Sequence, residues 1–238
     1  RTSAKKVDGG WVINGTKLWS TDAHRNHFMI ALVRTEAPSD NRHAGLSQVI
    51  VDLRNDGARI RPIRNIAGGE DFNEVVFQDV FVPEDRVVGE PGNGWKQVTS
   101  ELAYERSGPE RFLSAFRVFV ELVRAAGADP SPAQAALIGK LASHVMTLRR
   151  MSISVAGMLE EGKSPEVEAA LVKELGNNFE KVLPELARLV VTSDGRSAGA
   201  PRFREAFTDT LLLSPSFTIR GGTREILRGV IARGLGLR

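Results

Sequence analysis

The chain has 238 residues in the proportions of an ordinary globular protein, with 42% hydrophobic and 26% charged residues. Its 32 basic and 29 acidic residues leave a formal charge of only +3 without a long basic run, so we expect no nucleic-acid partner. The lack of cysteine excludes disulfides and thiol catalysis, and the four histidines lack metal-ligand spacing, so no metal site is expected. No signal peptide or apolar run long enough to span a bilayer is recognisable, which favours a cytoplasmic protein.

The first half of the chain has the hydrophobic pattern of short β-strands. Asn14-Gly15 lies between strand-like segments 11–13 and 16–21 and predicts a two-residue hairpin turn, because both central residues of that turn need a positive φ. Further strands are expected at residues 28–34, 46–53, 58–64 and 73–82. Regularly spaced strands of this kind indicate a small antiparallel β-sandwich or barrel. A strand follows Arg1 almost at once, so residue 1 is interpreted as a cut.

The second half of the chain is predicted to be helical. Residues 94–126 have helical spacing, and a capping box at Ser131 begins a helix that ends at Gly162. Another helix is expected from residue 164 to about 191 with a bend at Pro184, then a shorter one after Pro201 and a last one from 221–223 to about 233. Long helices with short loops favour an up-down four-helix bundle. The predicted class is therefore α+β with two domains, residues 1–90 and 91–238.

One carboxylate has an unusual place in the predicted helices. Glu105 lies four residues before Pro109, which has no N–H and whose ring collides with the carbonyl four residues earlier. We expect the helix to kink there and to leave the carbonyl of Glu105 unpaired. The side chain is then either a solvated charge or a group placed for chemistry.

Two other segments allow two interpretations each. Gly221-Gly222 precedes Thr223, which is expected to be the N-cap of the last helix. This arrangement is typical either of a phosphate-binding site or of a plain turn with a helix cap. The segment 19–21 ends a strand and is either a core tryptophan with an edge hydroxyl or part of a site.

The order of these motifs resembles the acyl-CoA dehydrogenase family over nearly the whole chain. The segments that carry the resemblance are Lys-Leu-Trp-Ser-Thr-Asp-Ala (17–23), the strand 72–83, Gly-Glu-Pro-Gly-Asn-Gly-Trp (89–95), the pair Glu-Arg (105–106), Thr-Ile-Arg-Gly-Gly-Thr-Arg-Glu-Ile-Leu-Arg (218–228) and residues 231–237. The resemblance implies an FAD enzyme of fatty-acid and lipid metabolism, with a helical N-terminal domain, a central β domain and a C-terminal four-helix domain. This chain would hold most of the β domain, incomplete at its N-terminus, and all of the C-terminal domain, and alone it would be inactive.

The resemblance also implies which residues bind FAD. Trp19 matches the tryptophan that packs beside the isoalloxazine, and Thr21 matches the hydroxyl that reaches flavin N5. Ser20 lies between them and would offer its backbone. Thr223 and Glu225 match positions that touch the cofactor near its ribityl and phosphate region.

The family reaction removes an α-proton and a β-hydride from an acyl-CoA thioester and yields a trans-2-enoyl-CoA. In many members the base is a glutamate immediately before Gly-Thr in the last motif. In this chain that position is Gly221, which cannot act as a base. Other members place the glutamate on the first C-terminal helix, which here implies Glu105 as the α-proton base. Gly221 would keep its backbone N–H as a donor that polarises the thioester carbonyl, and Tyr104, Arg106 and Gly222 would line the substrate site.

The resemblance implies electron-transferring flavoprotein as the electron acceptor and a homo- or hetero-oligomer, a dimer or tetramer. Two family patterns contact the FAD of a neighbouring subunit, namely Arg-x-x-Phe-Gly and Gln-x-x-Gly-Gly-x-Gly. Both are missing here from the corresponding residues, 118–128 and 187–199. A divergent branch or a hetero-oligomer with a degenerate subunit would both fit. The alternatives to a dehydrogenase are a non-catalytic partner subunit and a flavin oxidase or monooxygenase on the same fold.

Overall fold

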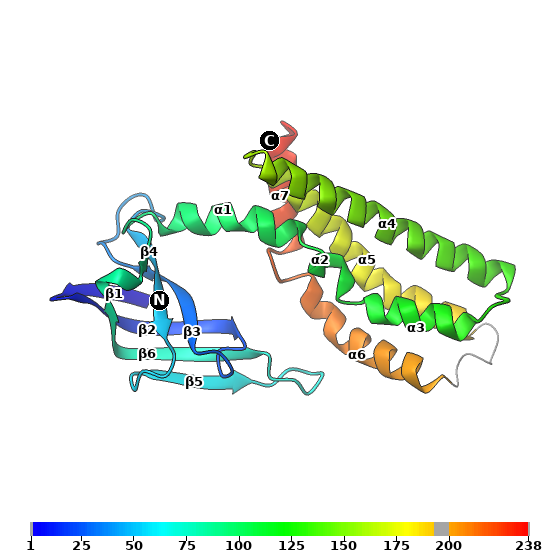
Figure 1. The fold of residues 1–238 in the computed structure, drawn as a ribbon, viewed down its shortest axis with the longest axis horizontal. Helices are drawn as coiled ribbons and strands as arrows, with labels where there is room; N and C mark the ends of the chain where they lie inside the picture. The colour runs from blue at the N-terminus through cyan, green and yellow to red at the C-terminus, as the bar shows by residue number, and fades with distance from the viewer. Residues whose placement is uncertain (1, 193–199, 238) are drawn as a thin grey trace. The chain divides into compact units, whose positions relative to one another are not determined.

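The computed structural model describes residues 2–192 and 200–237 of the chain (Figure 1). These residues form two compact units, Arg1–Ser100 and Glu101–Arg238, which are described separately. The first unit is built of strands and the second of helices, so the α+β class is confirmed. Within the described residues, no helix combines the length and the hydrophobicity that crossing a membrane requires.

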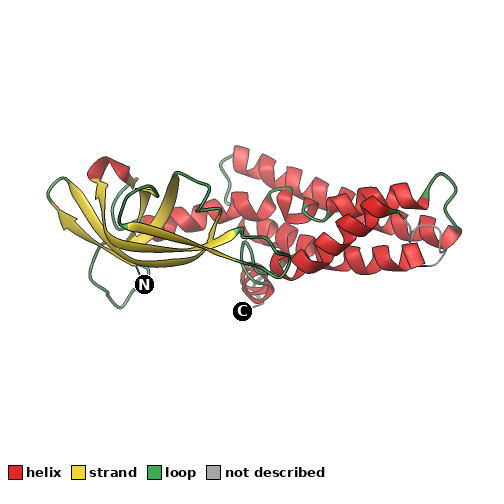
Figure 2. Cartoon of the chain, turned by 90° about the horizontal axis from the view of Figure 1, so that it is seen from below, coloured by secondary structure: helices red, strands yellow, loops and turns green. Residues whose placement is uncertain are grey.

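The described strands of the first unit belong to one curved sheet (Figure 2). They are β1 (Thr2–Val7), β2 (Gly10–Thr21), β3 (Phe28–Arg34), β4 (Leu46–Asp52), β5 (Ala58–Ile63), β6 (Phe72–Pro83) and β7 (Val87–Val88), with the short 3-10 helix η1 (Glu84–Arg86) before β7. Their order is β5-β6-β2-β1-β3-β4-β7, and every pair is antiparallel except β1 with β3. The strands predicted at 28–34, 46–53, 58–64 and 73–82 are therefore present within a residue or two of their expected ends.

The predicted hairpin at Asn14-Gly15 is wrong. Strand β2 continues through both residues, and the hairpin joins β1 to β2 at Asp8-Gly9, where Gly9 has a φ of +74°. At Asn14 the register between β2 and β6 shifts, which makes a β-bulge. The Asn14 amide donates to Asp79 Oδ1 at 2.8 Å and accepts from the Asp79 N–H at 3.0 Å. The Asn-Gly pair therefore serves a bulge opposite Asp79, which itself has a positive φ of 50°.

The core of the first unit comes from alternate residues of the long strands. In β6 buried and half-buried residues alternate over the first six positions, as expected for a strand with one covered face. The side chains with no exposed area that meet in this core are Ile13, Val33, Val49, Val51 and Val75. They fix the register of β2, because a shift by one residue would turn its buried side chains to the other face.

The second unit contains the long helices. The helices are α1 (Gly94–Ser107), which begins in the first unit, α2 (Glu110–Leu113), α3 (Phe116–Ala126), α4 (Pro132–Glu160), α5 (Glu166–Thr192), α6 (Pro201–Phe217) and α7 (Arg224–Gly234). Helices α3, α4, α5 and α6 run in alternating directions as an up-down bundle, as predicted (Figure 1). The capping box at Ser131 is confirmed, since Ser131 Oγ accepts from the Gln134 N–H and the Gln134 side chain accepts from the Ser131 N–H.

The single helix expected over 94–126 is instead divided into three segments. Helix α1 ends at Ser107 rather than bending, because Gly108 and Pro109 follow and the proline cannot extend the helical hydrogen bonds. As predicted, the carbonyl of Glu105 has no helical partner. The Nε of Arg111 donates to this carbonyl at 2.8 Å, so the break is closed by a side chain.

Candidate functional site

In the β unit, the end of β2 has a strained backbone at the predicted cofactor residues. Trp19 has a φ of 62°, which is uncommon for a bulky residue and often marks a functional position. The strand pairing with β6 shifts between Lys17 and Ser20, so the Trp19 side chain leaves the regular alternation. Trp19 is 64% exposed, and its ring meets the ring of Phe72 edge-on at 6.0 Å between centroids. An open indole face of this kind suits stacking against a flat aromatic ring.

Asn73, on β6, holds this corner in place. Its side chain is fully buried, and its Nδ2 donates to the carbonyl of Ser20 at 3.0 Å. Its Oδ1 lies 2.9 Å from Nδ1 of His24. Asp22 follows with a φ of 49°, and its N–H donates to the carbonyl of Asp71 at 2.7 Å. Sequence reasoning assigned no role to Asn73, although this residue lies in the 72–83 segment that carries the family resemblance.

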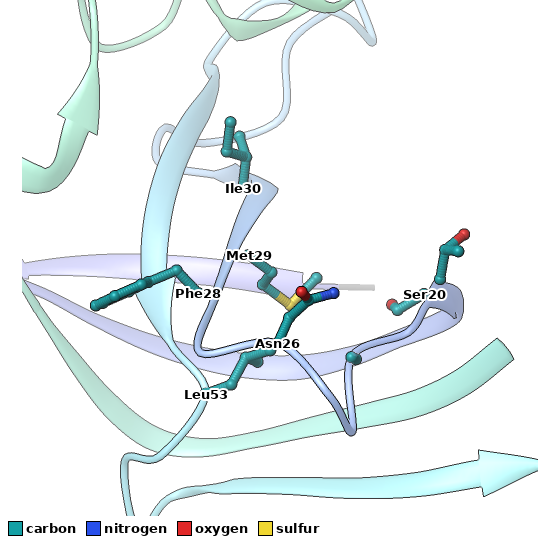
Figure 3. Close-up of a pocket in the computed structure, with 8 residues that line it drawn as sticks. Ser20, Asn26, Phe28, Met29, Ile30 and Leu53 are labelled. Atoms are coloured by element: carbon teal, nitrogen blue, oxygen red, sulfur yellow. The ribbon is translucent and has the colours of Figure 1, made fainter. Parts of the chain in front are cut away.

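A cavity of about 320 Å³ lies beside the same corner (Figure 3). The residues that line it are Ser20, Thr21, Ala23, Asn26, Phe28, Met29, Ile30 and Leu53. Ser20 and Thr21, two of the three residues of this unit that were predicted to bind FAD, therefore contribute to its wall. Thr21 is an exposed residue.

We predict that Asn73→Ala lowers the free energy of unfolding by roughly 1–3 kcal/mol, because it removes a fully buried side chain that donates to the half-buried carbonyl of Ser20. Urea unfolding followed by tryptophan fluorescence measures the change. Asn26→Ala is the matched control: Asn26 is exposed and donates only to the Asp22 carbonyl at 3.0 Å, so its loss should cost less than about 0.5 kcal/mol. Equal effects of the two substitutions would contradict the anchoring role of Asn73.

In the helical unit, Glu105 and Gly221 come together although they are far apart in the sequence. A Cβ atom built on Gly221 would lie 3.4 Å from Oε1 of Glu105, 3.4 Å from Cε of Lys173 and 3.8 Å from Cζ of Arg111. Glu105 is 42% exposed in its side chain, and its Oε1 accepts from a terminal nitrogen of Arg111 at 2.6 Å. The carboxylate thus occupies the space beside Gly221 from a different helix.

The predicted substrate residues have different surroundings. Arg106 is buried, and its Nε donates to the carbonyl of Gly221 at 3.0 Å, so this guanidinium fixes the peptide that follows Gly221. Burial lowers the pKa of Arg106. Tyr104 is 63% exposed, and an added Cβ on Gly222 would lie 3.5 Å from Arg106.

The start of α7 has the backbone that the glycine pair predicts. Gly221 and Gly222 have φ values of +66° and +105°, which other residues rarely adopt. Thr223 is the N-cap by its backbone, but its side chain makes no capping hydrogen bond to a backbone N–H. Glu225 is exposed, and its pKa is lowered by its own backbone N–H and by the Thr223 hydroxyl.

A buried lysine lies under Gly221 and was not found by sequence reasoning. Lys173, on α5, has no exposed area, and its Nζ donates to Asn177 Oδ1 at 2.6 Å and to the carbonyl of Phe217 at 3.1 Å. Burial, followed by the positive charge of Arg220, lowers its pKa from 10.5 to about 8. Sequence spacing offers little signal for such a residue, because Lys173 looks like one of many surface lysines until the fold buries it.

Three ion pairs bind the segment before and within α7 to α5. The Glu180 carboxylate is fully buried and pairs with Arg220 at 3.1 Å, although burial raises its pKa. Glu174 pairs with Arg224 at 2.8 Å and with Arg228 at 3.0 Å. Arg220 precedes the glycine pair and Arg224 follows it, so these ion pairs with α5 fix the position of the pair.

We predict that Lys173 makes stability rise with pH above about 8. The folded protein releases this proton near pH 8, whereas the unfolded chain retains it to about 10.5, so the unfolded state binds more protons between these values and high pH favours folding. Relative to Lys173→Met, the free energy of unfolding should increase by up to about 3 kcal/mol from pH 7 to pH 10.5. Urea unfolding of both proteins across this range measures it. A difference that is constant with pH would contradict the buried charge.

The oligomer prediction concerns two segments of the helical unit, 118–128 and 187–199. The residues 118–128, which lack the first cross-subunit pattern, form most of α3 and the turn after it. Of the residues 187–199, which lack the second, 193–199 lie outside the described residues. The expected loss of cofactor contacts between subunits stays a prediction.

Comparison with known proteins identifies the family. The family model for the acyl-CoA dehydrogenase middle domain matches residues 1–80, and the model for the acyl-CoA dehydrogenase C-terminal domain matches residues 92–236. Two relatives from Mycobacterium tuberculosis are acyl-CoA dehydrogenase IpdE1, 36% identical over 99% of this chain and 62% of its own length, and acyl-CoA dehydrogenase FadE34, 33% identical over 99% of this chain and 32% of its own length. The solved butyryl-CoA dehydrogenase from Megasphaera elsdenii superimposes with a TM-score of 0.83 at 21% identity, over 100% of this chain and 63% of that chain. The chain thus spans a third to three fifths of the length of these proteins, and it belongs to the acyl-CoA dehydrogenase family, whose members are FAD-dependent flavoproteins.

Proposed function

We infer that the protein of which this chain forms the β and C-terminal helical parts oxidises an acyl-CoA thioester to a trans-2-enoyl-CoA. Glu105 takes the α-proton, and the β-hydride goes to flavin N5. The family supports acyl-CoA dehydrogenation in general, and the specific base is our proposal. The domains would be residues 1–90 and 91–238, close to the two family-model matches and the two compact units.

The observation that carries this proposal is the short distance between Glu105 and Gly221. In members with the base in the last motif, a glutamate side chain begins at the position of Gly221. Here an added Cβ at that position would lie 3.4 Å from Glu105 Oε1, so the carboxylate from α1 reaches the place where that other side chain would start. This agrees with a base that has moved from the last motif to the first C-terminal helix.

The α-proton of a thioester is barely acidic, so the base needs a polarised carbonyl to work against. Glu105 supplies an acceptor oxygen whose direction is fixed by Arg111. Gly221 supplies a backbone N–H that would donate to the thioester oxygen as enolate charge develops, and Arg106 holds the peptide next to it. Tyr104 and Gly222 are the further residues proposed to line the acyl-CoA path.

The residues of each unit fit FAD when considered separately. In the β unit, Trp19 offers an exposed ring, and Ser20 and Thr21 border a cavity. In the helical unit, the glycine pair leaves the backbone open at the start of α7, where Thr223 and Glu225 would face the ribityl and phosphate region. When bound, the flavin would supply the hydride acceptor that no side chain of the chain can provide.

The partners and location extend the same proposal. Electron-transferring flavoprotein would take up the electrons, and the whole protein would form a homo- or hetero-oligomer. A cytoplasmic location stays a prediction. We expect this chain by itself to be inactive, because the matched relatives are longer and the family resemblance places part of the flavin and substrate site upstream.

We predict that Glu105→Gln in the full-length protein lowers kcat by about 10²- to 10⁴-fold while bound flavin is retained, because an amide cannot accept the proton. Turnover of acyl-CoA thioesters with an artificial electron acceptor, together with the visible flavin spectrum, measures both effects. Glu205→Gln is the matched control: Glu205 also pairs with an arginine, Arg117 at 3.0 Å, but at an exposed place on the bundle, and its loss should leave kcat unchanged.

The same measurement separates the alternatives. Wild-type turnover by the Glu105→Gln protein would refute Glu105 as the base and would favour a partner subunit as the site of chemistry. Turnover with oxygen and without an added acceptor would favour a flavin oxidase or monooxygenase instead.

A further inference from the structure

Arg111 contacts Glu105 at both ends of the residue. Its Nε donates to the Glu105 carbonyl at 2.8 Å, and a terminal nitrogen donates to Glu105 Oε1 at 2.6 Å. One planar guanidinium therefore holds the main chain and the carboxylate of the same residue. Such a two-point contact removes rotational freedom from the glutamate side chain, which an ion pair at a single atom would not do to the same degree.

The main-chain contact exists because of the break after α1. Pro109 has no N–H to give to the carbonyl of Glu105, so this carbonyl is available to a side chain. Arg111 follows two residues later, in the short helix α2, and its side chain is only 10% exposed. The approach of α5 keeps it there, since an added Cβ on Gly176 would lie 2.5 Å from the carbonyl of Arg111. The main chain of Arg111 is thus held against α5 by packing that does not involve Glu105, and the guanidinium extends from this fixed position to Glu105.

The other charged groups around the carboxylate have partners of their own. Arg106 donates to the Gly221 carbonyl, and Lys173 donates to Asn177 and Phe217. Glu110 lies 3.5 Å from the Arg111 Nε but is 55% exposed and interacts through a longer contact. The direction of the Glu105 carboxylate is therefore controlled mainly by Arg111.

We propose that Arg111 is a positioning residue that aims the Glu105 carboxylate at the α-carbon of the substrate. This rests on the proposed function, in which Glu105 is the base. The proton step breaks the α C–H bond, the proton goes to an oxygen of Glu105, and the electron pair stays on the thioester as an enolate. Arg111 does not touch the substrate in this step and acts through Glu105 alone.

The test measures proton abstraction without oxidation, in the full-length protein. A 3-thia-acyl-CoA has sulfur at the β-position and cannot release a hydride, so exchange of its α-hydrogens with D₂O, followed by proton NMR, reports the base directly. The variants are Arg111→Lys, Arg111→Gln, Glu105→Gln and the double variant Arg111→Gln/Glu105→Gln. Arg117→Gln, which removes the exposed partner of Glu205, is the matched control.

We expect Arg111→Gln to slow exchange by about 10- to 100-fold, since a displaced reacting group can cost that much. Arg111→Lys keeps the charge but can contact only one of the two Glu105 oxygens that Arg111 contacts, the main-chain carbonyl oxygen and Oε1. Its exchange rate should therefore lie between those of Arg111→Gln and the wild type. The dissociation constant of the thioester should change by less than about threefold, because Arg111 makes no contact with it. The double variant should exchange no more slowly than Glu105→Gln alone.

The outcomes separate this proposal from the proposed function. If Glu105→Gln loses exchange while both Arg111 variants keep the wild-type rate, the positioning role is refuted and the base stands. If Glu105→Gln exchanges like the wild type, the base itself is refuted. A double variant that is clearly slower than Glu105→Gln would give Arg111 a role of its own and overturn the proposal. If Arg111→Gln does not fold, Arg111→Lys decides, and a folded protein with the wild-type exchange rate would refute the proposal.

Discussion

The peptide nitrogen of Pro109 carries no hydrogen, and the arrangement around Glu105 follows from that one missing donor. Helix α1 ends at Ser107, the carbonyl of Glu105 is left without a helical partner, and the buried guanidinium of Arg111 takes its place. The same guanidinium then holds the carboxylate. A break that would weaken a helix elsewhere thereby fixes the direction of the side chain on which the proposed chemistry depends.

The second requirement is that Gly221 stay close to this carboxylate. Helix α5 provides it through buried charges: Glu180 holds Arg220, and Glu174 holds Arg224. Burying charged groups costs desolvation free energy, and only the pairing and the added hydrogen bonds offset it. A network of this kind contributes less to stability than an apolar core would, but it fixes the segment 220–224 in one position. Lys173 belongs to the same layer and lies directly beneath the glycine.

The sequence was informative where local rules decide the outcome. Strand positions, the capping box at Ser131 and the missing partner of the Glu105 carbonyl follow from hydrophobic spacing and from the chemistry of single residues, and the structure has them. The hairpin at Asn14-Gly15 failed because the same dipeptide also suits a bulge, and only the pairing with β6 decides between the two. The helix over 94–126 was predicted as one because apolar spacing continues across the break.

The supporting residues of the candidate site could not be predicted, for a different reason. Arg111, Lys173 and Asn73 are polar residues whose roles arise from burial and from partners distant in the sequence, such as Ser20 for Asn73. No spacing pattern marks them. The site residues named from the family resemblance could be located from the sequence, because each lies in a motif of known position. Their roles stay proposals.

The most direct test of the central claim is a crystal structure of the full-length Glu105→Gln protein with its flavin and a bound acyl-CoA thioester. The account predicts that the side chain at position 105 lies roughly 3 to 3.5 Å from the α-carbon of the acyl chain, the distance expected of reacting groups before proton transfer. A side chain at position 105 that points into solvent, with another carboxylate facing the α-carbon, would contradict it.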